Sequence, residues 1–269
     1  MSLLSAILGS AVAVGSSSAA ANSHRGVTDL IQRKVVDKQG PWDLPVGKRL
    51  SPSEAGKLSP TVRSALASAA ARTPFDQSLP DIGVGARNPH GYLFRPADNV
   101  IQLGTKKGTA LLTHELGHLE QLKASPSRYK IMSASSNTFG SKAPLAALTA
   151  GGVAYVLDQD VVNPGVAALS AGLLASLPSI AHEGDAWRRG NKILEGHLGS
   201  SGRKFNRLRS LKTMTPWMAT YAAAAAAPSA VFGISDFLRK KLRESNEIDT
   251  GDTDGPALHP QGEPSEGSQ

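Results

Sequence analysis

The chain has 269 residues, which suffices for one domain with additions or for two small domains, with ample length for a buried core. It contains no cysteine, which excludes disulfides, thiolate ligands and a cysteine nucleophile, so any metal must be held by histidines and carboxylates. Residues 1–243 hold 29 basic and 15 acidic residues, a net charge of +14. The basic clusters lie close to apolar runs, and only 5% of the residues are aromatic, which favours a membrane surface over nucleic acid as a partner.

The first 22 residues contain an apolar run from Leu3 to Val14, followed by small residues. The run is short for a membrane span, and no Lys or Arg precedes it as in a secretory signal. A weak targeting signal, a short anchor and a disordered leader therefore remain open for residues 1–22.

Residues 23–78 are expected to form an N-terminal region of linker and short helices. A short helix is expected at 27–37, and Ser-Pro pairs at Ser51 and Ser59 are typical of helix starts. A further helix is expected over 61–72, capped by Ser59 and with Pro60 at its first position.

Three short strands are expected next, at 81–85, 91–95 and 99–103, because clusters of turn residues separate these extended segments. They predict a small antiparallel sheet directly before the following helix.

That helix is expected from Thr109 to about Ala124, and it carries a His-Glu-x-x-His pattern. Residues four apart on a helix lie one above the other, so His114 and His118 can present two imidazoles to one metal ion. Glu115 lies about 100° round the helix from His114, where it can act as general base on a water at that metal. The alternative is a core helix with two ordinary histidines, but burying them unliganded beside a glutamate is costly.

Two nearly uncharged runs, 143–157 and 161–180, predict an apolar helical hairpin over 143–180. A third apolar run, 214–234, lies in a basic segment, 201–243. We expect at least two of the three runs to enter a membrane, which would make the protein multi-pass. Burial of these alanine-rich runs in a soluble helical bundle is the alternative.

Charges at the two ends of the hairpin predict its orientation. Lys142 and Arg188-Arg189 flank its base, whereas its tip carries Asp158 and Asp160. The positive-inside rule then places the tip outside and the metal site on the cytoplasmic side. At the end of the chain, residues 244–269 are acidic and rich in Gly, Pro and Ser, which predicts a disordered tail.

The stretch 181–190, directly after the hairpin, supplies candidates for a third ligand. A catalytic zinc usually has three protein ligands and one open position, and the candidates here are His182, Glu183 and Asp185. At helical spacing Glu183 shares one face with Ala186 and Gly190, whose small side chains permit close packing against another helix. The remaining histidines considered are interpreted as surface or structural residues: His24, His90 and His197.

The two segments together have a specific resemblance. A His-Glu-x-x-His helix followed, after an apolar hairpin, by Glu183-x-x-Ala186-x-Arg188-Arg189 resembles the membrane-bound neutral zinc metallopeptidases. It is similar, more distantly, to the CAAX-prenyl protease and heat-shock membrane protease group of gluzincins. The resemblance covers residues 80–195, and the chain departs from both patterns at Trp187, where Ser or Asp is expected.

The resemblance implies a zincin-like catalytic domain over residues 79–200 that binds Zn²⁺ through His114, His118 and Glu183, with Glu115 as the catalytic residue. Arg188, Arg189 or His182 would orient a ligand or stabilise developing negative charge. Peptidases of this type commonly bind substrate as an added strand at a sheet edge. The edge strand expected here consists of Asn99, Val100, Ile101, Gln102 and Leu103.

The sequence therefore predicts an α+β, mostly helical protein that acts as a zinc-dependent, membrane-associated endopeptidase. Its expected partners are a membrane-associated peptide or protein substrate and membrane lipids, rather than nucleic acid. One alternative is a membrane-associated or virion structural protein in which a non-catalytic zinc site joins the helices. Another is a basic membrane-active or nucleic-acid-binding protein in which the His-Glu-x-x-His pattern is accidental.

Overall fold

The computed structural model describes residues 40–72, 78–85, 91–138, 142–157, 162–199 and 228–238, together with residues 33, 219, 226, 240 and 241. The expected leader at 1–22 and acidic tail at 244–269 lie outside these ranges, as does the expected helix at 27–37 apart from Arg33. The elements in chain order are β1 Arg49–Leu50, α2 Pro52–Leu58, α3 Pro60–Ala70, β2 Asp81–Val84, β3 Leu93–Arg95, β4 Val100–Leu103, α4 Thr109–Ala124, α5 Pro126–Thr138, α6 Ala143–Leu157 and α7 Pro164–Leu198.

The first two helices begin at the serines identified in the sequence. At α2, the Ser51 side chain accepts from the Glu54 backbone N–H, and the Glu54 carboxylate accepts from the Ser51 backbone N–H. At α3, the Ser59 side chain accepts from the Val62 backbone N–H, with Pro60 in the first turn. Each serine satisfies a backbone N–H that the helix itself leaves without a partner, which explains why both helices start there.

The sheet is mixed rather than antiparallel. Its strand order is β1-β2-β4-β3, with β2 and β4 parallel and the other two pairs antiparallel. The expected edge strand, Asn99–Leu103, corresponds to β4 and therefore lies inside the sheet, between β2 and β3. Burial agrees with this order: Val100 and Ile101, which point to opposite faces of β4, are 9% and 0% exposed, whereas Leu93 on β3 is 52% exposed. The edge strands of the described sheet are β1 and β3.

Helix α4 has the predicted limits and crosses α7 at very close range. A Cβ atom on Gly117 of α4 would overlap the carbonyl group of Ala186 on α7, and a Cβ atom on Gly190 would lie 2.5 Å from the Thr113 carbonyl oxygen. Only glycine at both positions lets the two backbones approach this closely. The small-residue face expected around Ala186 and Gly190 is thus the contact surface, and it brings α4 and the second half of α7 together.

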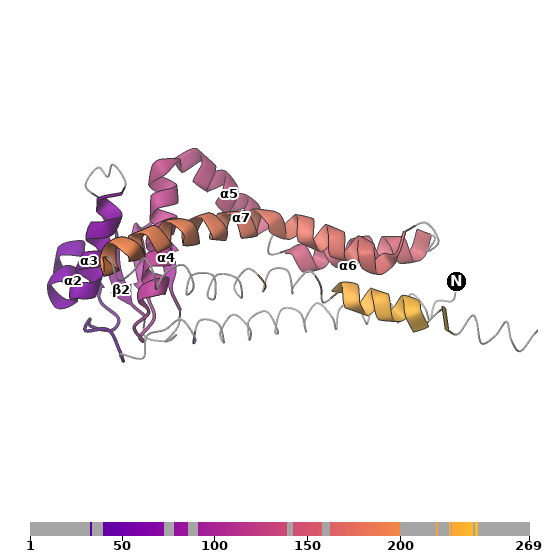
Figure 1. Ribbon diagram of the computed structural model, residues 1–269, viewed down its shortest axis with the longest axis horizontal. Coiled ribbons are helices and arrows are strands. Elements are labelled where there is room, and N and C mark those ends of the chain that lie inside the picture. The colour runs from indigo at the N-terminus through magenta and orange to yellow at the C-terminus, as the bar shows by residue number, and fades with distance from the viewer. Residues whose placement is uncertain are drawn as a thin grey trace, which may run out of the picture.

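The predicted apolar hairpin is formed by α6 and the first half of α7, which lie side by side at one end of the molecule (Figure 1). α7 is 35 residues long and contains Pro178. It continues beyond the apolar run and carries the candidate ligand segment in its second half. Residues 228–238, the described part of the third apolar run, are helical and join the hairpin, where Asn163 Nδ2 donates to Asp236 Oδ2 at 3.2 Å. Helix α5 was not predicted.

One described helix, α7, is long and apolar enough to cross a membrane by length and composition, whereas α6 is apolar but has 15 residues. Large apolar side chains are exposed on α6, on the first half of α7 and on residues 228–238: Leu145, Val153, Val156, Leu157, Val166, Leu169, Leu174, Leu177, Ile234, Phe237 and Leu238. We call these three segments the apolar arm. The described residues thus contain one candidate span by this test, where the sequence predicted at least two.

The crossing of α4 and α7 can be tested with one glycine. We expect Gly190→Ala to lower the free energy of unfolding by about 1–3 kcal/mol, the usual cost of overpacking a well-packed contact, because the added Cβ would force the helices apart. Chemical denaturation measures the change. The matched control is Gly152→Ala on α6, where no atom lies within 4 Å of the new Cβ; it should stabilise by about 0.5–1 kcal/mol through helix propensity. Equal effects of the two substitutions would contradict the close crossing.

Candidate metal centre

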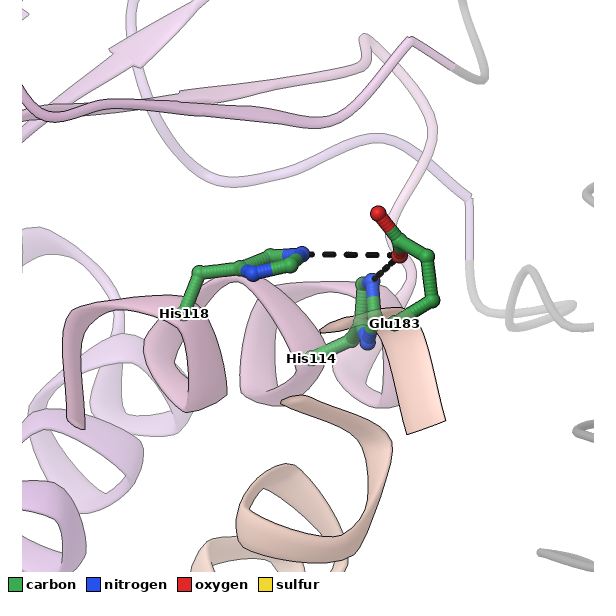
Figure 2. A group of neighbouring side chains, drawn as sticks. All are labelled: His114, His118 and Glu183. Carbon is green, nitrogen blue, oxygen red and sulfur yellow. Dashed lines mark hydrogen bonds and ion pairs between the residues drawn. The ribbon is translucent and has the colours of Figure 1, made fainter. Parts of the chain in front are cut away.

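His114 and His118 project from α4, one turn apart, toward Glu183 on α7 (Figure 2). His114 Nε2 lies 3.1 Å from Glu183 Oε2, and His118 Nε2 lies 3.5 Å from the same oxygen. One donor atom from each residue falls within 4.8 Å of the others, which is close enough to bind a metal ion. Of the three candidates at 181–190, it is Glu183 that joins this group; His182 and Asp185 do not. Two imidazole nitrogens and one carboxylate oxygen suit zinc and other first-row transition ions.

Gln121 fixes the orientation of the His118 ring, and sequence reasoning did not identify it. Its Nε2 donates to the His182 carbonyl oxygen at 2.8 Å and to Asp185 Oδ2 at 3.1 Å, so its Oε1 must be the atom that lies 2.9 Å from His118 Nδ1. An amide oxygen can only accept, so Nδ1 carries the hydrogen, and in the neutral ring the Nε2 lone pair faces Glu183. The signal was present in the sequence, since Gln121 follows His118 by three positions on the same helix.

The two arginines of the ligand segment contact Asp185 rather than Glu183. Arg188 Nε and Arg189 Nε lie 3.1 and 2.9 Å from the carboxylate oxygens of Asp185. Burial tends to raise the pKa of Asp185, but the hydrogen bonds from these guanidinium groups outweigh it and bring the pKa to about 2. Arg188 and Arg189 therefore do not orient Glu183 directly, as was expected. They bind Asp185, which accepts from Gln121, and Gln121 in turn contacts His118.

The negative charge of Glu183 is balanced by the ion pairs that it forms with His114 and His118. Burial tends to raise the pKa of Glu183, but the two imidazoles nearby hold it well below its usual range. Burial tends to lower the pKa of His118, but the Glu183 carboxylate outweighs this and raises it to about 9. The carboxylate thus stays ionised, which is the form that binds a cation, and a metal ion would take the place of the proton on His118.

Trp187, the position at which the chain departs from the related patterns, packs against His114. The two ring centroids are 4.4 Å apart, and the indole is 2% exposed. In the described part of the chain neither His114 Nδ1 nor Trp187 Nε1 has a hydrogen-bond partner. Both rings contact Glu183 through Nε2, but Nδ1 of His114 faces apolar packing, whereas Nδ1 of His118 is hydrogen-bonded to Gln121.

Glu115 and the three metal-binding candidates line one cavity of about 400 Å³. Residues of β3 and its flanks line this cavity, and so do residues of α5. Glu115 is 7% exposed, and its Oε2 accepts a hydrogen bond of 2.7 Å from the backbone N–H of Phe94 on β3. On α5, burial together with the charges of Glu115 and Glu183 raises the pKa of Tyr129 to about 12.

The strand that borders this cavity differs from the expected one. Tyr92, Leu93, Phe94 and Pro96 line it, and none of Asn99, Val100, Ile101, Gln102 and Leu103 does. Asn99 instead lies in a turn with positive φ, where its side chain donates to backbone carbonyl groups of residues 78 and 79. Among the other histidines, His24 and His90 lie outside the described residues, and His197 lies near the end of α7, outside the group.

Comparison of the chain with protein-family models, with curated proteins and with solved structures finds no match. The function is therefore argued from the site itself.

The role of Gln121 predicts a measurable change in metal affinity. We expect Gln121→Leu to weaken Zn²⁺ binding about 10- to 100-fold, because the His118 ring loses the acceptor that orients it. Competition titration with a chromogenic chelator measures the affinity. Gln102→Leu on β4 is the matched control, since Gln102 is half-buried and outside the cavity, and it should leave the affinity unchanged. If Gln121→Leu binds Zn²⁺ as tightly as the wild type does, Gln121 does not orient the His118 ring for metal binding.

Proposed function

We propose that this protein is a zinc-dependent endopeptidase associated with a membrane. The observation that carries the proposal is that His114, His118 and Glu183 converge on one cavity that Glu115 also lines. The donor set fits a catalytic zinc with three protein ligands. Structural zinc sites are closed by a fourth protein ligand, whereas an open cavity of about 400 Å³ lies over this group. That difference favours the enzyme over the structural protein with a non-catalytic site.

The chemistry follows from where the side chains lie. Zinc bound by the three residues would supply a Lewis acid that polarises a water molecule and the scissile carbonyl group. Glu115 takes the proton from the water and passes it to the leaving amine. The Phe94 N–H orients one carboxylate oxygen of Glu115, and the other has no hydrogen-bond partner among the described residues, so it is available as proton acceptor.

The substrate is proposed to bind along β3. β3 is an edge strand whose residues line the cavity, whereas β4 is paired on both sides. An extended peptide added to an exposed strand gains main-chain hydrogen bonds and is held straight across the catalytic group. This assigns to β3 the role that the sequence had suggested for residues 99–103.

The catalytic role of Glu115 can be separated from metal binding. We expect Glu115→Gln to abolish cleavage of a mixture of quenched fluorogenic peptides and to keep its zinc, because the amide cannot accept the proton and Glu115 is not a ligand. Metal content is measured on the same sample by atomic emission. Glu195→Gln, on α7 and outside the cavity, is the matched control and should keep full activity. Full activity in Glu115→Gln would refute the mechanism.

The membrane association is supported by the continuity of α7. At about 1.5 Å rise per residue, Glu183 lies roughly 5 Å along the helix axis beyond the apolar run ending at residue 180. A site so close to the end of a spanning segment would act on peptide bonds near the membrane surface. We propose that the apolar arm inserts as a multi-pass unit and, from Lys142, Arg188 and Arg189 at its base, that the site faces the cytoplasm.

Insertion of the arm is tested by placing a charge on its exposed face. Leu174, in the middle of the apolar run of α7, is 66% exposed, and Arg at the centre of a span costs about 2.5–3.5 kcal/mol. We expect Leu174→Arg to move the protein from the carbonate-resistant membrane fraction to the soluble fraction or to aggregates. The control is Leu58→Arg at the end of α2, also exposed at 49%, which should remain in the membrane fraction. If both variants fractionate like the wild type, the arm does not insert.

A further inference from the structure

The part of the cavity lined by α5 includes one side chain, Tyr129, whose position suggests a part in catalysis. Tyr129 lies near the start of α5, is 9% exposed, and lines the cavity together with Glu115, His114, His118 and Glu183. Its ring packs edge-on against His182, with centroids 5.3 Å apart, and the His182 ring lies 4.9 Å from that of His118. Tyr129 is thus held in place by a neighbour of the metal-binding group.

The hydroxyl of Tyr129 is free to donate. It has no hydrogen-bond partner among the described residues, and it is not one of the fully enclosed polar atoms that lack a partner. Tyr129 lines the cavity over the metal-binding group and also a smaller one, of about 50 Å³, beside Gln121 and Asp185. Other hydroxyl groups on the cavity wall are engaged: Tyr92 donates to the Lys106 carbonyl oxygen at 2.6 Å, and Ser136 pairs with Ser179 at 2.9 Å. Ser133, one turn further along α5, is the remaining hydroxyl on that wall.

Peptide hydrolysis at this site needs such a donor. As water adds to the carbonyl carbon, the π electrons of the C=O bond move onto oxygen, and the C–N bond breaks when Glu115 delivers a proton to nitrogen. A fixed donor aimed at the oxygen that gains charge lowers the barrier, since it binds the transition state more tightly than the substrate. A peptide lying along β3 would pass the cavity that Tyr129 also lines.

We propose that the Tyr129 hydroxyl donates a hydrogen bond to the scissile carbonyl oxygen as it becomes an oxyanion, with His182 positioning the phenol ring. This inference rests on the proposed peptidase function and assigns a further catalytic residue to it. Tyr129 is supplied by α5, which lies outside both sequence segments that carry the metal-binding pattern.

The test is Tyr129→Phe, which keeps the ring and its contact with His182 and removes only the hydroxyl. We expect kcat on a quenched fluorogenic peptide to fall about 100-fold, as for the loss of one oxyanion donor, with KM and zinc content nearly unchanged. A phosphinic peptide, which mimics the tetrahedral oxyanion, should bind the zinc-loaded variant about 100-fold more weakly by calorimetry, and a ground-state product peptide should bind equally well. Tyr155→Phe on α6, outside the cavity, is the matched control and should match the wild type in all five measurements.

The outcomes separate this proposal from the one on which it rests. If the wild type cleaves the peptide and Glu115→Gln does not, while Tyr129→Phe retains kcat and phosphinic peptide affinity, then Tyr129 is not the donor and the peptidase proposal stands. Equal loss of affinity for the phosphinic and product peptides would make Tyr129 a purely structural residue. If the wild type neither cleaves nor binds the phosphinic peptide, both proposals fail.

Discussion

The close crossing of α4 and α7 is the constraint on which the rest of the site depends. His118 and Glu183 are 65 residues apart in the chain, and they meet because Gly117 and Gly190 let the two helix backbones come into contact. A side chain at either glycine would collide with backbone rather than with a flexible neighbour. Backbone cannot move aside without moving the whole helix. Glycine at positions 117 and 190 is therefore what allows the three metal-binding candidates to meet.

Burial of so many polar groups at this crossing has to be offset by pairing. Glu115, His114, His118 and Glu120 are all less than 9% exposed, and each buried charge would be costly if left alone. Glu183 is shared by both imidazoles, Glu120 is paired with Arg72, and Gln121 joins His118 to Asp185. The result is a connected polar network inside an otherwise apolar contact, with an open cavity on one side. A network of this kind is expected where a catalytic ion must be held in fixed geometry.

α7 links the candidate centre to the apolar arm within a single helix. One end packs with α6 and residues 228–238, and the other carries Glu183 and Gly190 (Figure 1). A helix is a stiff element, so the position of the apolar arm largely fixes the position of Glu183 on the same helix. Because the centre lies on helices, with β3 and α5 lining its cavity, its position relative to the apolar arm is fixed by α7.

Features that depend on residues close along the chain could be predicted from the sequence. Ser51 and Ser59 start helices because a cap bonds to the next turn, His114 and His118 share a face because of the helical repeat, and the uncharged runs form a helical hairpin. The contacts of Gln121 with His118, and of Arg188 and Arg189 with Asp185, also lie three or four positions apart on one helix. In contrast, the internal position of β4 and the position of Tyr129 on the cavity wall are visible only in the folded protein. Strand order and the meeting of α4, α5 and α7 depend on the packing of segments far apart in sequence, where local spacing carries no information.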